Sequence, residues 1–252
     1  MTTADRVLAV LGLFSLERPE WTVEAIVAEL GLSGSTAYQY VRSLAQAGLL
    51  VANKPGRYTI GPAALELDRI ARHVDPLVRQ ARPVLEELVD ACALPAIGLL
   101  CRLYRREVMC VDQYVPHSPG LDSSYERGRP MPLTRGSASR VILANLPPRA
   151  LRRFYGSAAA EVAAAGLGGD WEEFRRRAQA ARRAGVLTAI GELDAGALGI
   201  SAPVFGNDAS ILGSISLVIS AAPTAADAAL VTHLERCVRA AGTTISEALR
   251  GD

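Results

Sequence analysis

Apolar residues recur at helical spacing in three stretches near the start of the chain. The first stretch predicts a helix from residue 4 to about 16. Thr22 and Ser33 are suitable N-cap residues. We therefore expect a second helix that follows Thr22 and stops at Gly31, and a third that begins at Ser33 and ends near Gly48. These two helices meet across a three-residue turn.

A hairpin pattern follows the three helices. Residues 49–52 and 57–60 are strand-like runs on either side of the turn 53–56. The order helix, helix, helix, hairpin is typical of a winged helix-turn-helix, and a three-helix cap without a DNA role is the alternative. The third helix exposes hydroxyl and longer hydrogen-bonding side chains that suit a major groove, and we expect its DNA contacts to come from Ser33, Gly34, Ser35, Thr36, Tyr38, Gln39 and Arg42.

The remainder of the chain mixes helical and strand patterns. Pro62 opens an amphipathic helix that Asp75 and Pro76 break, and its apolar face is a candidate hinge or dimer seam. Further segments predict an α+β domain with a central antiparallel sheet: helices at 77–91, 137–145, 148–155, 171–184 and 224–249, and strands at 96–104, 108–115, 198–205 and 211–219. The expected divisions are a winged helix-turn-helix at 1–61, a linker helix at 62–75 and a larger domain at 76–252.

Composition narrows the class of protein but does not reveal its partner. Half of the 252 residues are hydrophobic and the net charge is +1, so a sizeable core is expected and gross charge does not indicate nucleic-acid binding. No apolar run reaches membrane-spanning length and no signal peptide opens the chain, which predicts a cytoplasmic protein. Cys92, Cys101, Cys110 and Cys237 lack metal-binding spacing, so we expect reduced thiols.

The N-terminal motifs resemble the DNA-binding module of IclR transcription regulators. The resemblance rests on EAIVAELGLSGSTAYQYVRSL at 24–44, AGLL at 47–50 and GRYTIGP at 56–62. It implies a wing whose Arg57 and Tyr58 join the DNA-binding set. Gly34 and Gln39 stand where family members often carry Lys and Arg, so the operator sequence does not carry over from relatives.

Three later segments resemble the IclR effector domain, which is similar to GAF-type small-molecule sensors. They are GRPMPLT at 128–134 with the following Ser139-Arg140, the segment 191–204, and GSISL at 213–217. The resemblance implies an effector site that includes Ser137, Ala138, Ala189, Gly199, Ser214 and Ser216, with Met131 and Leu133 as an apolar wall. Alternatively, Ser214 and Ser216 face solvent or bond to the backbone.

Physical chemistry adds a preference for acids at this predicted site. A helix that begins after Thr134 presents free backbone N–H groups near Gly136, Ser137 and Ala138, and such groups favour an anion. We therefore expect a small organic-acid effector. The predicted function is sequence-specific binding of double-stranded operator DNA under the control of this effector, by a homodimer or tetramer that needs no cofactor, metal or membrane.

Several alternatives remain open from the sequence. Cys101, Cys110, His117 and Glu192 are the components of a possible thiol enzyme, but no catalytic motif joins them. The histidines His73, His117 and His233 are too scattered to predict a metal site. The arginine run 175–177 is either a second nucleic-acid patch or, as its interleaved glutamates favour, a solvated helix face. A winged helix that binds a protein partner is a further alternative.

Overall fold

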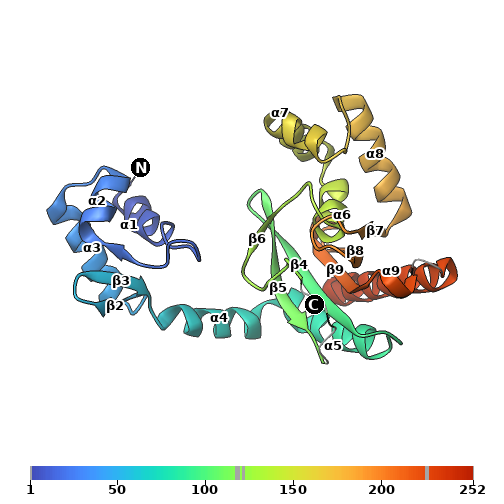
Figure 1. Cartoon of the computed structure of the whole chain (residues 1–252), viewed down its shortest axis with the longest axis horizontal. Coiled ribbons are helices and arrows are strands. Elements are labelled where there is room, and N and C mark those ends of the chain that lie inside the picture. The colour runs from blue at the N-terminus through green and yellow to red at the C-terminus, as the bar shows by residue number, and fades with distance from the viewer. Residues whose placement is uncertain (1, 117–119, 121–122, 225–226, 252) are drawn as a thin grey trace. The chain divides into compact units, whose positions relative to one another are not determined.

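The chain folds into two compact units. The computed structural model describes residues 2–116, 120, 123–224 and 227–251, and its units are Met1–Val74 and Asp75–Asp252. Figure 1 labels the helices and strands of both. In the described part of the chain, no helix has the length and apolar character needed to cross a membrane.

The N-terminal unit has the predicted order of three helices and a hairpin, followed by one further helix (blue to teal in Figure 1). Its elements are α1 (Thr3–Leu11), β1 (Trp21–Thr22), α2 (Val23–Leu30), α3 (Gly34–Gln46), β2 (Leu50–Lys54), β3 (Arg57–Ile60) and α4 (Ala63–Val74).

Two side-chain caps place α2 and α3 where the sequence predicts them. The Thr22 hydroxyl accepts a hydrogen bond from the Ala25 backbone N–H at 3.2 Å, and the Ser33 hydroxyl accepts one from Thr36 N–H at 3.3 Å. Each bond satisfies a backbone donor that the first helical turn leaves without a partner. Gly31 ends α2 with a φ of 62°, a left-handed conformation that glycine adopts at little cost.

The prediction that the first helix runs to residue 16 is wrong, because α1 ends at Leu11. The amides of Leu13 and Phe14 bond three residues back, to Val10 and Leu11, so the helix tightens and stops. The buried Trp21 indole donates to the Leu13 carbonyl at 3.0 Å, and this bond ties the segment after α1 to the start of β1.

Trp21 also begins the two-residue strand β1, which the sequence does not predict. β1 pairs antiparallel with β3, and the sheet order is β1-β3-β2. Two residues are too few to show the alternation that identifies a strand. Ile26, Val41 and Leu44 pack with the ring of Trp21 in the core of this unit.

The helix α4 is amphipathic, as predicted, but no side chain on it is buried within this chain. Its large apolar residues are strongly exposed: Leu65 at 74%, Leu67 at 57%, Ile70 at 51% and Val74 at 64%. An apolar helix face of this kind is removed from water only when it packs against another surface.

The C-terminal unit is built on a six-stranded antiparallel sheet, as predicted. The strand order is β6-β5-β4-β9-β8-β7. The strands are β4 (Ala96–Tyr104), β5 (Glu107–Tyr114), β6 (Pro130–Pro132), β7 (Leu187–Ile190), β8 (Ala197–Phe205) and β9 (Ile211–Ser220). The sequence did not indicate the short edge strands β6 and β7. The helices are α5 (Pro76–Asp90), α6 (Ser137–Asn145), α7 (Pro148–Ala164), α8 (Trp171–Ala184), η1 (Ala222–Thr224) and α9 (Ala228–Gly251).

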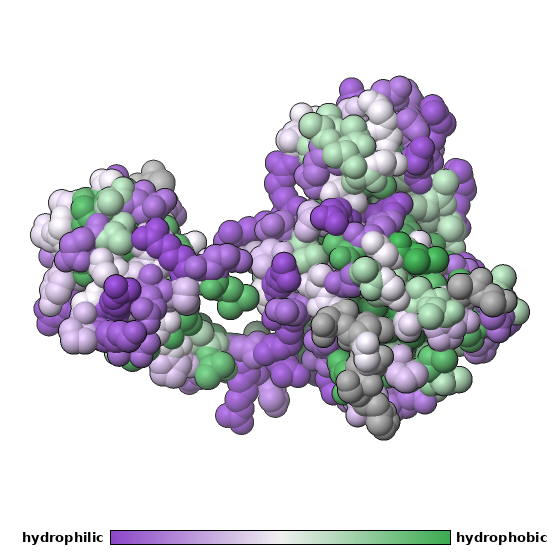
Figure 2. Space-filling view, viewed as in Figure 1, coloured by the Kyte–Doolittle hydropathy of each residue, from purple (hydrophilic) through white to green (hydrophobic). Residues whose placement is uncertain are grey.

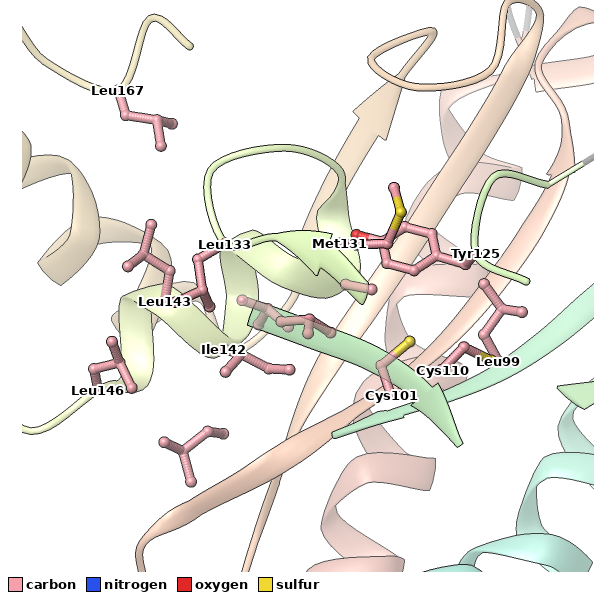
Figure 3. Packing of buried hydrophobic residues seen from close by; sticks show 14 of the residues in the cluster. Leu99, Cys101, Cys110, Tyr125, Met131, Leu133, Ile142, Leu143, Leu146 and Leu167 are labelled. Atoms are coloured by element: carbon pink, nitrogen blue, oxygen red, sulfur yellow. The ribbon is translucent and has the colours of Figure 1, made fainter. Parts of the chain in front are cut away.

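Helices cover both faces of this sheet, so its central strands are buried on both sides. Leu99 and Cys101 of β4 pack in the cluster that contains α6, α7 and α8, while Leu100 packs with α5 and α9. Successive side chains of a strand point to opposite faces, which explains the division. Figure 3 shows part of the first cluster, with Leu143 and Leu146 of α6 and its C-terminal end.

The helix α7 is longer than the predicted segment 148–155. It continues to Ala164 through a kink at Ala158, whose φ is −135°. Just before the kink, the Ser157 hydroxyl donates to the carbonyl oxygens of Arg153 and Phe154. The helix continues because Val162, beyond the kink, is fully buried in the core.

Two glycines test how tightly the sheet is packed. A Cβ on Gly213 of β9 would lie 2.0 Å from the Cys101 carbonyl oxygen, whereas a Cβ on Gly156 of α7 would meet nothing within 4 Å. We predict that Gly213→Ala lowers the free energy of unfolding by about 2 kcal/mol or more, because the backbone itself must move. Gly156→Ala should raise it by about 0.5–1 kcal/mol. Urea denaturation followed by circular dichroism measures both, and equal midpoints for the two variants would contradict the packing argument.

Candidate functional site

The helix α3 separates its buried and exposed residues cleanly. Ala37, Tyr40, Val41 and Leu44 are buried. Six of the seven predicted DNA-contact residues of this helix and its cap are exposed, and the seventh, Thr36, is half-buried; the exposed ones are Ser33, Gly34, Ser35, Tyr38, Gln39 and Arg42. The exposed face therefore presents small residues at the N-terminal end of the helix and longer side chains one turn further on.

The hydroxyl groups at this helix end are already bonded to one another. The Ser33 oxygen lies 2.7 Å from that of Thr36 and 3.2 Å from that of Ser35. Ser33 therefore serves first as the cap of α3. The side chains of Tyr38, Gln39 and Arg42 have greater reach from the exposed face.

The hairpin β2–β3 carries the other two predicted contacts. Tyr58 is half-buried and packs against the core of the unit, while Arg57 is exposed. The Arg57 guanidinium lies 3.5 Å from the Glu20 carboxylate, which also accepts a hydrogen bond from the Asn53 amide at 3.0 Å. Glu20 was not predicted to take part. It joins both strands of the hairpin to the segment before β1.

The C-terminal unit contains a cavity between α6, the sheet and the loop that joins β7 to β8. We call it the sensor cavity. Its lining residues are Leu99, Ser123, Tyr125, Gly136, Ser137, Ala138, Ala189, Gly191, Glu192, Leu193, Asp194, Ala197, Gly199, Ser216 and Val218. The structure thus brings together five of the eight residues predicted for the effector site: Ser137, Ala138, Ala189, Gly199 and Ser216.

The other three predicted residues do not line the sensor cavity. Met131 and Leu133 are 5% and 2% exposed and pack in the hydrophobic core, where Figure 3 shows both among the buried side chains. Ser214 is fully buried, and its hydroxyl donates to the Ala138 carbonyl at 3.0 Å. Bonding to the backbone was one of the alternatives for this serine. The strand alternation places Ser214 and Ser216 on one face but does not show which of them reaches the cavity.

A chain of three serine hydroxyls joins α6 to the sheet beside the cavity. The Ser201 hydroxyl donates to the Ser137 oxygen at 2.8 Å and lies 2.8 Å from the Ser216 oxygen, and all three residues are buried. Ser201 was missed from the sequence. Ser201 lies directly opposite Ser216 in the pairing of β8 with β9, and no local sequence pattern reveals this pairing.

Tyr125 completes the polar lining at the start of α6. Its hydroxyl donates to the Arg135 carbonyl at 3.1 Å, accepts from Ser139 N–H at 3.2 Å and lies 2.8 Å from the Ser139 hydroxyl. Burial raises the pKa of Tyr125 well above its usual value, so the phenol stays neutral at physiological pH. Tyr125 lies in an irregular loop before the helix, and no local sequence pattern indicates its role.

The backbone N–H groups at the start of α6 are not all free, contrary to the prediction. Gly136 N–H donates to the Glu192 carboxylate at 3.1 Å, and the same carboxylate pairs with the Arg140 guanidinium. Within the described residues, the amides of Ser137 and Ala138 donate no hydrogen bond. Ser137 and Ala138 both line the cavity, so their amides are candidate donors for an anion.

The alternative thiol and metal sites gain no support from the geometry. Cys101 and Cys110 are cross-strand neighbours and fully buried, and the hydrogen bond of the Cys101 thiol to Cys110, together with burial, raises the pKa of Cys101. A thiol held neutral in this way is a poor nucleophile. His117 lies outside the described residues. Among the described residues, no three His, Cys, Asp or Glu side chains are grouped so as to hold a metal ion.

The arginines of α8 lie on an exposed, ion-paired surface. Arg175 pairs with Glu172 at 2.8 Å and Arg177 pairs with Glu173 at 2.7 Å. Figure 2 shows hydrophilic residues over this helix. These pairs favour the interpretation of the arginine run as a solvated helix face.

Comparison with known proteins agrees with both parts of this description. Residues 3–54 match the family model of the IclR helix-turn-helix domain, and residues 71–247 match that of the bacterial transcriptional regulator IclR C-terminal domain. The chain is 26% identical over 221 residues to the HTH-type transcriptional regulator KipR of Bacillus subtilis, covering 85% of this chain and 84% of that protein.

Solved structures show the same fold. The structure of a putative IclR transcriptional regulator from Silicibacter sp. superposes with a TM-score of 0.80 at 21% identity, over 100% of this chain and 97% of that one. An IclR homolog from Microbacterium hydrocarbonoxydans, crystallised with 4-hydroxybenzoate, gives 0.76 at 24% identity over 100% of both chains. The second family model alone spans well over half of the sequence. The chain belongs to the IclR family of bacterial transcription regulators, with a helix-turn-helix DNA-binding domain and a C-terminal ligand-binding domain.

Proposed function

We propose that this protein is a cytoplasmic regulator whose binding to a specific operator is controlled by a small organic acid in the sensor cavity. Residues 1–61 are the DNA-binding part, 62–75 a linker helix and 76–252 the effector domain. The observation that carries the proposal is the start of α6. There, two backbone amides that donate no hydrogen bond within the described residues and a chain of serine hydroxyls border one cavity. No catalytic step is part of it.

The chemistry of the cavity supports an acidic effector. Backbone N–H groups at a helix start favour negative charge, and neutral hydroxyls complete its hydrogen bonding without burying a charge that needs its own partner. The similar regulator from Microbacterium was crystallised with 4-hydroxybenzoate, which is such an acid. Small carboxylic acids are therefore the first class to screen.

The exposed face of α3 supports the proposed role in DNA recognition. A recognition helix lies in the major groove, where its exposed side chains reach base edges and the DNA backbone, and dimers read paired half-sites. We propose that Gln39 reads a base edge, with Tyr38 and Arg42 beside it, and that Ser33, Gly34, Ser35, Thr36, Arg57 and Tyr58 approach the DNA backbone.

Gln39 tests the base contact. We predict that Gln39→Ala weakens binding to the operator by about 1–3 kcal/mol and changes binding to random DNA much less, because only the operator offers the matching base edge. Gln46→Ala is the matched control, since Gln46 is an exposed glutamine at the far end of α3. Gel-shift titrations measure both. Equal losses on both DNAs would make Gln39 a phosphate contact or a bystander.

Ala138 tests the effector site. It is 1% exposed and lines the sensor cavity, so Ala138→Val adds two methyl groups beside the proposed anion donors. We predict at least tenfold weaker binding of acids that stabilise the wild type in a thermal-shift screen including 4-hydroxybenzoate, with operator affinity of the apo-protein nearly unchanged. The exposed Ala163→Val of α7 should retain wild-type binding. If both variants kept it, the effector would bind elsewhere.

The exposed apolar face of α4 tests the proposed dimer. We propose that Leu67, Ile70 and Val74 pair with their counterparts in a second copy. Burying two isoleucines contributes about 3 kcal/mol or more, so Ile70→Glu should raise the dimer dissociation constant by about 100-fold. Arg69→Glu alters charge at the neighbouring exposed position and should have little effect. Sedimentation equilibrium distinguishes them, and a wild-type monomer at micromolar concentration would refute the dimer.

A further inference from the structure

One carboxylate of the protein already occupies part of the proposed anion site. Glu192 Oε2 accepts the Gly136 N–H at 3.1 Å, and Oε1 pairs with Arg140 Nη1. A third contact holds the same residue through its backbone, because the Arg135 guanidinium donates to the Glu192 carbonyl at 2.9 Å. Glu192 is thus fixed against the first turn of α6.

This position is the one in which a ligand carboxylate would be most stable. The partial positive charge of a helix N-terminus is concentrated on its first N–H groups, and a single carboxylate satisfies it. A second carboxylate beside Glu192 would face charge repulsion, and of the backbone donors at this turn only the Ser137 and Ala138 amides would remain for it. An acidic ligand and the Glu192 side chain therefore compete.

Glu192 also takes up space in the sensor cavity. With Glu192 in place, the space open to the centres of water molecules is about 40 Å³. Glu192 itself lines the cavity, so its side chain takes up room that a ligand could use. Departure of this side chain would enlarge that room and free the Gly136 N–H.

The loop that carries Glu192 begins and ends at glycines and lies outside the strands β7 and β8. It spans residues 191–196 between β7 and β8, and Gly191 and Gly196 lie at its ends with φ values of 63° and 77°. The hydrogen bond from Gly191 N–H to the Ala197 carbonyl at 2.9 Å closes its base. Glycines at both ends give the loop backbone freedom that other residues would not.

We propose that Glu192 is an internal ligand of the effector site, which an acidic effector must displace to bind. Glu192 thereby sets the affinity for acids, and its release removes one contact of the loop 191–196, in which Asp194 still accepts a hydrogen bond from Ser124 N–H at 2.9 Å. Arg140, whose Nε is buried and has no partner among the described residues, stays beside the incoming anion. The inference rests on the proposed function of the sensor cavity, and it adds the competitor that the effector replaces.

Acetate tests this competition without knowledge of the natural effector. In Glu192→Ala the start of α6 loses its carboxylate, so acetate should bind at least tenfold more tightly than to the wild type. At ten times its dissociation constant it should raise the melting temperature by about 3–5 °C. Acetamide, which has the same shape without the charge, should not. The amide resonance of Gly136 should shift in the variant and return towards its wild-type position with acetate.

Glu172→Ala is the matched control. It removes an exposed carboxylate that pairs with Arg175 on α8, outside the sensor cavity, and should gain no acetate response. An equal response of wild type, Glu192→Ala and Glu172→Ala, or no response of Glu192→Ala beyond that to acetamide, would overturn the proposal.

A second variant keeps the test decisive if Glu192→Ala does not fold. Glu192→Gln preserves the size of the side chain and one acceptor oxygen but removes the charge, which weakens its hold on Gly136 and Arg140. Acetate should bind it about tenfold more tightly than the wild type, and equal affinity would refute the competition. Failure of the proposed function has a different signature: no acid would alter wild-type operator binding, although the Glu192 variants would still bind acetate.

Discussion

The turn at Gly136 determines the geometry of the sensor unit. Its φ of 78° brings the chain into α6, and a Cβ there would lie 2.5 Å from Leu193 and 2.7 Å from the Tyr125 hydroxyl oxygen. Only glycine allows both the backbone conformation and this close approach. The first residues of α6 after this turn, Ser137 and Ala138, line the sensor cavity. The loop from β7 to β8, the buried tyrosine and the helix are therefore positioned by one residue without a side chain.

Because both faces of the sheet are buried, the polar side chains near that turn need hydrogen-bond partners within the protein. The side chains of β8 and β9 that face α5 and α9 pack in an apolar cluster, whereas Ser201 and Ser216 on the opposite face form a chain of hydrogen bonds with Ser137 of α6. A buried hydroxyl without a partner would destabilise the fold, so these three satisfy one another. Because each hydroxyl can both donate and accept, the chain can reorganise when a ligand takes one of its bonds.

Local signals in the sequence predicted most of the elements, but they could not predict the contacts that build the site. Thr22 and Ser33 cap helices through neighbours three residues away, so a short pattern contains the information. Glu192 and Arg140 are 52 residues apart, and Tyr125 reaches Ser139 from an irregular loop. Such pairs depend on strand order and register. The sequence therefore predicted donors at the start of α6 but not the carboxylate that occupies one of them.

The competition at α6 also constrains how a signal can leave the sensor unit. A ligand shifts an equilibrium only by the difference in its affinity for two states. If the site were empty and rigid, an acid would bind both states equally and change nothing. With Glu192 as the internal ligand, the two states differ in the position of a charged side chain and of the loop attached to it. Coupling to the DNA-binding unit would then begin with the two groups that lose the Glu192 carboxylate, which are Gly136 N–H and the Arg140 guanidinium.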